Sequence, residues 1–338
     1  MTDASDSSGP PQDRPVSAVL DQAAAAALRA PSILNTQPWR WIVHERSMEL
    51  RAAAERHLAA LDPQSRMLVT SCGAALDHAL ISLRAQGYSA RVELLPEPDD
   101  PELLAMIFPI GPQPIRPEDI RHFQSTLRRH TDRRPFAADP VPLAALVGLT
   151  EAALTHGVYV HVVRTDQVPL LASAALTAAR TEQADPAAQA ELARWSHRLL
   201  GATDGVPGDV TVPYAARPVP LRPLSEDARG ALSPGPGDDS GARYLILWGD
   251  QDGRRAWLRA GRALSAVWLV AAELGLAVSP MTDLVEVAGT RLTLRRMLSW
   301  QGHPYVVLRV GVAAADSAIP ATARHSHDED IDIVGRTS

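Results

Sequence analysis

The segment APSILNTQPWRW, close to the N-terminus, places polar side chains that could bind a ligand between two prolines. Pro31 and Pro38 cannot both lie inside one helix, because proline lacks a backbone N–H and crowds the preceding turn. The segment therefore predicts a shaped loop that carries Ser32, Asn35 and Gln37. A carboxamide offers one acceptor and two donors on a flat group, which suits the edge of a planar heterocycle with alternating N–H and C=O groups. The alternative is a loop whose amides bond to their own backbone.

A run of arginines, RRHTDRR, spans residues 128–134 and follows a predicted helix. Arg129, Thr131 and Arg133 could converge on one phosphate, because guanidinium groups and a hydroxyl are suitable partners for phosphate oxygens. The alternative, and the commoner fate of a charge run, is a solvated turn whose arginines pair with surface carboxylates. Asp132 could serve as such a partner, so the residues alone leave both interpretations open.

A third polar segment, SPMTD at residues 279–283, follows a predicted helix that ends at Gly275. It could form a turn that faces a ligand. The alternative, which the residues by themselves favour, is that Thr282 or Asp283 caps the next helix.

Several familiar catalytic patterns are missing from the sequence. There is no GxGxxG before a helix, no Walker loop and no GxSxG elbow. The single cysteine, Cys72, is expected to be a small buried residue. The histidines and acidic residues at 325–330 are expected to belong to a solvated tail, so no metal site is predicted.

Hydrophobic periodicity and turn residues predict the elements that must position these segments. Helices are expected over residues 16–29, 65–86, 117–127, 141–156, 168–180, 187–200 and 254–274. Strands are expected over residues 39–43, 91–95, 103–110, 159–163, 243–248 and 305–312, with residues 48–51 continuing the first of them. The two longest helices each end near a glycine and lead into a strand, which hints at an internal duplication, although such units also recur in unrelated proteins.

The segment 201–241 interrupts this pattern, because it is rich in proline and glycine and has little periodicity. Loops of this length inside a compact chain are usually lids, binding loops or linkers. Trp195, His197 and Tyr214 lie in or near this segment and could touch a ligand, but core packing or loop anchoring is an equally good explanation.

Composition excludes some classes of function. The chain has 338 residues, a net charge of −6 and no lysine, which argues against general binding to nucleic acid or to an anionic membrane. One cysteine permits no intrachain disulfide, which fits a reducing, cytoplasmic setting. Residues 1–15 are polar and lack the apolar core of a signal peptide, so a disordered tail is expected.

Together the motifs resemble those of the nitroreductase family. APSILNTQPWRW resembles its flavin-edge motif, RRHTDRRPF its phosphate motif and GLAVSPMTD its turn near the reactive face of the isoalloxazine. YVVLRVGVA, followed by Arg324, resembles its closing strand and phosphate-binding arm. The resemblance implies an α+β fold, FMN as cofactor and NADH or NADPH as reductant. The FMN-binding residues that it implies are Pro31, Ser32, Asn35, Gln37, Arg129, His130, Thr131, Arg133, Pro280, Met281, Thr282 and Arg324.

The order of the motifs departs from that of an ordinary member, in which the arginine motif comes first. Here each half of the chain keeps a complementary part of one site, as in the Acg-type branch of actinobacterial nitroreductase-like proteins. The resemblance therefore implies two tandem nitroreductase-like repeats that imitate the family's homodimer inside one monomer, with central mixed, mainly antiparallel sheets wrapped by helices. The expected divisions are 16–115 for the first repeat, 116–324 for the second with a lid at about 201–241, and 325–338 for an acidic tail.

The implied activity is an FMN-dependent oxidoreductase that moves hydride from NAD(P)H to a small acceptor. No catalytic side chain is named, because hydride transfer requires no side-chain acid or base. Two alternatives stay open. One is a protein that stores FMN under a closed lid, and the other is an enzyme that fragments the flavin itself.

Overall fold

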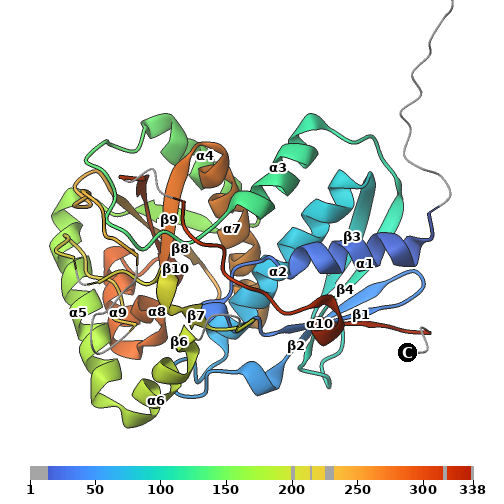
Figure 1. The fold of residues 1–338 in the computed structure, drawn as a ribbon, viewed down its shortest axis with the longest axis horizontal. Helices are drawn as coiled ribbons and strands as arrows, with labels where there is room; N and C mark the ends of the chain where they lie inside the picture. Colours follow the sequence, from blue (N-terminus) through green and yellow to red (C-terminus); the bar gives the residue numbers. More distant parts are fainter. Residues whose placement is uncertain (1–13, 199–201, 214, 225–231, 315–317, 336–338) are drawn as a thin grey trace, which may run out of the picture.

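The computed structural model describes residues 14–198, 202–213, 215–224, 232–314 and 318–335. Its main elements fall into two similar sets along the chain (Figure 1). The first set comprises α1 (Val16–Ala27), β1 (Trp39–Val43), β2 (Met48–Ala52), α2 (Arg66–Ala85), β3 (Tyr88–Leu94) and β4 (Leu103–Pro112). The second set comprises α4 (Leu143–Leu154), β5 (Tyr159–Val162), β8 (Arg243–Gly249), α7 (Arg254–Glu273), β9 (Leu276–Met281) and β10 (His303–Val312). The helix α3 (Pro117–Arg128) connects the two sets.

Further elements are inserted into or follow the second set. Between β5 and β8 lie α5 (Val168–Ala184), α6 (Pro186–Trp195), β6 (Ser196–Arg198) and β7 (Val206–Pro207). Between β9 and β10 lie α8 (Asp283–Glu286) and α9 (Ala288–Met297). The C-terminal segment crosses the molecule to end in α10 (His327–Asp330) and β11 (Ile331–Ile333), beside the first set (Figure 1).

The two main sheets share one internal order of strands. The first runs β11-β1-β2-β4-β3 and the second runs β5-β8-β10-β9. Neighbours are antiparallel throughout β1-β2-β4-β3 and β5-β8-β10-β9. β11 pairs with β1 in parallel, with Ile331 opposite Trp41. The predicted α+β class with mixed, mainly antiparallel sheets is therefore confirmed.

Each set follows the same path along the chain: helix, two strands, long helix, two strands. Both long helices are followed by a glycine in the left-handed region, Gly87 with φ of 82° and Gly275 with φ of 69°. Glycine ends a helix in this way because it has no Cβ to clash at positive φ. This parallel supports the hypothesis of an internal duplication.

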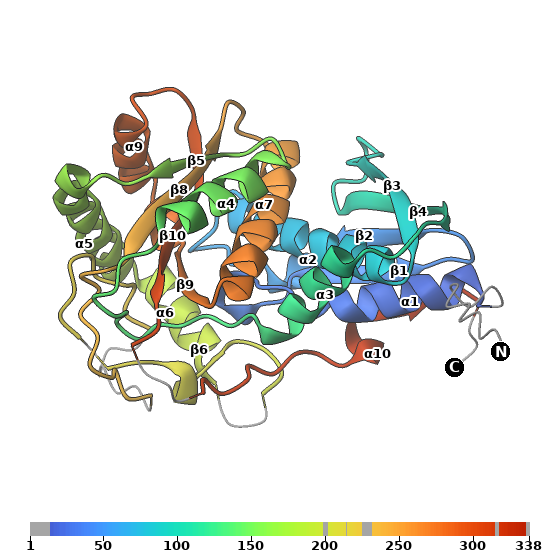
Figure 2. The same ribbon diagram turned by 90° about the horizontal axis from the view of Figure 1, so that it is seen from above.

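The two long helices pack against each other in the middle of the molecule (Figure 2). Gly73 of α2 and Gly261 of α7 lie at their crossing, where a Cβ on Gly73 would overlap the carbonyl oxygen of Leu258. A Cβ on Gly261 would overlap the carbonyl oxygen of Thr70 in the same way. The close approach of the helices therefore depends on glycine at both positions.

Replacing Gly261 with alanine should destabilise the protein by about 1–3 kcal/mol, because a methyl group forced against backbone must push the two helices apart. Thermal unfolding measures the effect. The matched control is Gly289→Ala in α9, where a Cβ would meet no atom within 4 Å. That change should leave stability equal or raise it by about 0.5–1 kcal/mol, since alanine is the better helix former. Equal melting temperatures for Gly261→Ala and the wild type would contradict this account of the crossing.

Several elements differ from the sequence-based expectations. Residues 48–52 do not continue the first strand but turn back as β2, antiparallel to it. The helix expected to reach residue 200 ends at Trp195 and leads into β6. α9 was not expected at all. Residues 327–333 form α10 and β11 rather than a solvated tail, and Asp330 is fully buried, so that expectation is wrong for this stretch.

Trp195 belongs to a buried cluster with Leu171 and Met281, so core packing is its observed role. His197 lies in β6. Tyr214 and residues 1–13 lie outside the described residues, so the disordered tail stays a prediction. Among the helices of the described ranges, none combines the length and the apolar character that crossing a membrane requires.

Candidate functional site

A cavity of about 310 Å³ lies where elements from both sets meet. Its lining comes from the loop before β1, the segment after α3, the end of β9 and the C-terminal segment. Residues of the 201–241 insert, including Val206, Val210 and Leu221, line it as well. Twelve residues were expected to bind the cofactor, and all but Gln37 line the cavity. The eleven that do are Pro31, Ser32, Asn35, Arg129, His130, Thr131, Arg133, Pro280, Met281, Thr282 and Arg324.

The loop before β1 has an unusual backbone. Leu34, Asn35 and Gln37 have positive φ values of 44°, 55° and 48°, which residues with a Cβ seldom adopt. Two serine hydroxyls support this shape. Ser32 Oγ accepts from the backbone N–H of Gln37 at 2.9 Å, and Ser71 Oγ on α2 accepts from the loop at 3.1 Å. A strained backbone held by its surroundings is typical of a ligand-binding segment.

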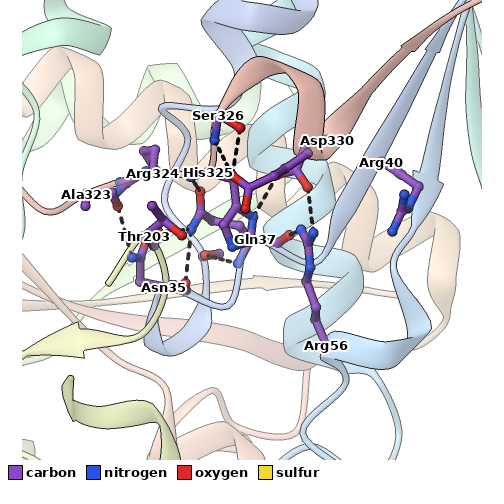
Figure 3. A network of polar contacts seen from close by, with 12 residues as sticks. Asn35, Gln37, Arg40, Arg56, Thr203, Ala323, Arg324, His325, Ser326 and Asp330 are labelled. Carbon is purple, nitrogen blue, oxygen red and sulfur yellow. Dashed lines mark hydrogen bonds and ion pairs between the residues drawn. The ribbon is translucent and has the colours of Figure 1, made fainter. Parts of the chain in front are cut away.

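The Asn35 side chain is buried and half satisfied. Its amide nitrogen donates to the carbonyl oxygens of Gly205 at 3.0 Å and Ala323 at 3.2 Å (Figure 3). These two acceptors fix the orientation of the amide, because only the NH₂ group can donate. The Oδ1 atom has no hydrogen-bond partner among the described residues. A buried acceptor left without a partner is costly, so Oδ1 is suited to accept from a bound ligand.

Gln37 has a different place from the one expected. Its side chain is fully buried; its amide nitrogen donates to Thr203 O at 2.8 Å and its oxygen accepts from His325 N at 2.9 Å (Figure 3). Its carboxamide therefore joins the insert to the C-terminal segment. Arg56 extends the network, donating to Gln37 O at 2.7 Å and pairing with Asp330 at 2.7 Å.

Replacing Gln37 with glutamate should loosen the insert, because a carboxylate cannot donate to Thr203 and would face its carbonyl oxygen. Losing one satisfied buried pair costs about 1–3 kcal/mol. Limited trypsin digestion measures the result, and cleavage after Arg229 of the insert should become faster; Arg217 and Arg222 are each followed by proline and are poor sites. The matched control is Gln64→Glu, an exposed position, which should be cleaved like the wild type. Unchanged cleavage of the Gln37 variant would contradict the anchoring role.

Arg29, Arg129 and Arg324 line the cavity and form a cationic cluster. Burial, together with the Arg324 guanidinium, lowers the pKa of Arg129 to about 9. Burial likewise lowers the pKa of Arg324 to about 10, with Arg29 adding to the effect. Within the described ranges no carboxylate pairs with any of the three side chains; Arg129 instead stacks on Trp268 at 4.6 Å and donates to Arg29 O at 3.3 Å. Such a cluster is electrostatically complementary to an anion.

The arginine run divides between the cavity and the core. Arg133 lines the cavity, and burial lowers its pKa to about 10, while Asp132 opposes the shift and Arg309 adds to it. Asp132 and Arg134 do not line the cavity but pair with each other at 2.8 Å. The solvated-turn alternative therefore does not describe the run. His130 lines the cavity while its ring remains exposed.

The segment after β9 also lines the cavity, without capping the next helix. Thr282 occupies the N-cap position of α8, but no side chain makes a capping hydrogen bond there. Asp283 is 1% exposed and lines the cavity, and neither of its carboxylate oxygens has a hydrogen-bond partner among the described residues. The structural-cap alternative is therefore not observed.

Sequence reasoning missed Arg29, Arg222 and Trp268 as lining residues. Arg29 directly precedes the first motif, and this position next to the motif was the signal that could have identified it. Trp268 lies on α7, and its place over Arg129 depends on how that helix packs. Arg222 lies in the insert, where no periodicity could place it.

The motifs, the fold and this cavity agree with a comparison against known families. The family model described as "Nitroreductase family" matches residues 126–312, more than half of the chain. The chain belongs to the nitroreductase family. In Mycobacterium tuberculosis, the protein named "Putative NAD(P)H nitroreductase Rv3131" is 36% identical, covering 96% of this chain and 95% of its own.

A second relative and one solved structure are also similar to the chain. "Putative NAD(P)H nitroreductase acg" of the same organism is 32% identical, covering 92% of this chain and 94% of its own. Among solved structures, the FMN and NADPH-dependent nitroreductase NfnB from sphigopyxis sp. strain HMH is similar with 20% identity and a TM-score of 0.41, covering 64% of this chain and 99% of that one.

Proposed function

We propose that this nitroreductase-family chain binds FMN in the cavity and works as an NAD(P)H oxidoreductase. The observation that carries the proposal is the cluster of the exposed Arg29 and the half-buried Arg129 and Arg324, none of which meets a carboxylate in the described ranges. The relatives named as NAD(P)H nitroreductases support the reductant, and the nitroreductase named as FMN-dependent is in keeping with the cofactor.

The residues present fit FMN chemically. Arg129, Arg133, Arg324 and the Thr131 hydroxyl would hold its phosphate, because charge-assisted bonds to guanidinium groups are the strong ones. Asn35 Oδ1 would accept from an N–H on the polar edge of the ring. Ser32, Pro31 and His130, with Pro280, Met281 and Thr282 across the cavity, would border the ligand. Most of the other lining side chains, such as Leu34, Met67 and Val306, are apolar and would exclude water.

Bound FMN would supply the redox chemistry, accepting hydride from NAD(P)H and passing it to a small acceptor. The chain itself contributes the placement of the polar groups that would contact the ligand. Arg129 and Asn35 come from opposite halves of the chain, so both repeats must dock before the two polar groups face one cavity.

The repeated topology supports an intrachain pseudo-dimer that works as a monomer. The C-terminal segment of the second repeat adds β11 to the sheet of the first, as an exchanged arm would between two subunits. Sedimentation should therefore give a single 36.3 kDa species, and a stable dimer would contradict this part of the proposal.

A second candidate function, FMN storage under a closed lid, is favoured by the insert. Val206, Val210 and Arg222 line the cavity, and the insert is tied down by Asn35 and Gln37. A lid that never opens would exclude nicotinamide, whereas a lid that opens would only gate it.

The test is the visible spectrum of the purified protein after FMN is added and free flavin removed. A flavin band that bleaches with anaerobic NADH or NADPH supports the oxidoreductase. A band that bleaches only with dithionite supports storage. A protein that retains no flavin overturns both.

A further inference from the structure

A buried group of charges lies beside the cavity and takes no part in the cationic cluster. Arg222 of the insert pairs with Glu182 of α5 at 2.5 Å and with Glu286 of α8. Asp283 lies one turn before Glu286 and faces the same arginine electrostatically. The group therefore holds three carboxyls against one guanidinium, so full ionisation would leave two uncompensated negative charges in a buried place.

Within this group Asp283 is the carboxyl to which Arg222 makes no hydrogen bond. The guanidinium of Arg222 donates hydrogen bonds to Glu182 and Glu286. Asp283 is 1% exposed, lines the cavity and has two oxygens without hydrogen-bond partners in the described ranges. The backbone N–H groups of Asp283 and Leu284 lie near its carboxylate, but neither makes a bond of good geometry.

The surroundings favour the protonated form of this carboxyl. Burial raises the pKa of Asp283 to about 6; Arg222 opposes the shift and Glu182 adds to it. Burial also raises the pKa of the neighbouring Glu286 to about 7, with Arg222 opposing. Asp283 is thus about half protonated near pH 6, where an ordinary carboxyl would be ionised, and it can exchange its proton with the cavity.

We propose that Asp283 donates a proton to the small acceptor that is reduced in this cavity, an inference that rests on the proposed function. Reduction of a quinone to a hydroquinone takes two electrons and two protons. Reduced FMN, when bound, would supply both electrons and the first hydrogen together as a hydride and would itself be oxidised. Asp283 gives the second hydrogen as a proton to a quinone oxygen, an O–H bond forming there as the carboxyl O–H breaks. The carboxylate then takes a proton from water.

The first test follows the proton without any turnover. Infrared difference spectra of the protein between pH 5 and pH 8 should contain a carboxylic acid C=O band that titrates near pH 6 and is missing from Asp283→Asn. Identical spectra for the two proteins would overturn the proposal. The isosteric amide removes only the proton and the charge, and circular dichroism checks that the variant is folded.

The second test uses the holoenzyme. FMN-loaded protein is reduced with one equivalent of dithionite and mixed anaerobically with a water-soluble benzoquinone, and flavin reoxidation is followed by stopped flow. A proton donor acts while protonated, so the wild-type rate should fall as the pH rises through about 6. Asp283→Asn should be slower by about 100-fold at pH 5 and independent of pH.

Glu182→Gln is the matched variant. Removing this like charge should lower the pKa of Asp283, so the fall in rate should move to lower pH. Asp283→Asn with the rate and pH profile of the wild type would overturn the proton donor while leaving the flavin enzyme intact. Failure to load FMN shows before any quinone is added, and it overturns the proposed function instead.

Discussion

The double variant Arg129→Gln, Arg324→Gln should lose FMN binding, yet the ligand-free protein should be at least as stable as the wild type. Each guanidinium gives charge-assisted bonds to a phosphate worth about 1.5–3 kcal/mol. Losing two of them should weaken FMN binding by about 100-fold to 10,000-fold. Titration of protein into FMN, followed by flavin fluorescence, measures the affinity.

The stability of the ligand-free protein should move the opposite way, and the sign follows from the pKa values. Burial and the neighbouring guanidinium lower the pKa of Arg129 in the folded chain to about 9, well below its ordinary value. At pH 7 both folded and unfolded chains are protonated there, so the folded state bears the full cost of the confined charge. That cost begins to fall as the pH rises through the folded pKa of about 9, and it is gone only above the higher pKa of the unfolded chain. Neutral glutamines remove it at pH 7.

The matched control for both effects is Arg46→Gln, Arg121→Gln, which makes the same change of net charge at two exposed positions away from the cavity. It should keep FMN affinity and melting temperature. A cavity double variant with wild-type FMN affinity would contradict the phosphate assignment. If the cavity double variant without FMN melts well below the wild type, the arginines stabilise the fold and do not form a destabilising site for an anion.

Replacing Asp239 with asparagine should destabilise the protein by about 3–5 kcal/mol, because it leaves a buried guanidinium without its counter-charge. Arg309 and Asp239 are both almost fully buried and are 2.6 Å apart. Arg309 also donates to the carbonyl oxygens of Asp132 at 2.8 Å and Arg134 at 3.0 Å, and Asp239 accepts from the N–H of Phe136 at 2.6 Å. The pair thus fixes β10, the end of the insert and the arginine run together.

Thermal or urea unfolding measures this loss. The matched control is Asp166→Asn, which breaks a similar Arg–Asp contact with Arg164 at 2.9 Å whose side chains are 61% and 69% exposed. Exposed pairs contribute little, so the control should melt like the wild type. The double variant Asp239→Asn, Arg309→Met should recover part of the stability, because the Arg309 charge is then gone from the core; the recovery is partial since Arg217, 3.6 Å from Asp239, also loses its partner. Equal losses for Asp239→Asn and Asp166→Asn would contradict the buried-pair account.

The sequence predicted the elements best where periodicity is strong. The helices around residues 66–85 and 254–273 and the strands at 39–43 and 303–312 follow from apolar spacing and terminal glycines, which are local signals. The sequence-based prediction was wrong at 187–200, where the alanine-rich helix ends at Trp195. It was also wrong at 327–333, where the acidic composition suggested a tail but a short helix and a strand form. β11 gains its hydrogen bonds from β1, almost 300 residues earlier, and no local pattern reports such a partner.

The motifs by themselves determined the family and eleven of the residues that line the cavity, because loop residues that meet a ligand are chosen for their chemistry and leave a readable pattern. Only the tertiary structure decided how each side chain is used. Gln37 lies in the same motif as Asn35, yet the chain folds back over it and occupies both ends of its amide. In the sequence, Arg309 is a single polar residue in an apolar strand; in the structure it pairs with Asp239. In the sequence, Asp283 is a candidate helix cap; in the structure Arg222 bonds to other carboxylates and leaves it without a partner among the described residues. Burial and partners far apart in the chain set hydrogen bonding and pKa, so the roles of these residues appear only in three dimensions.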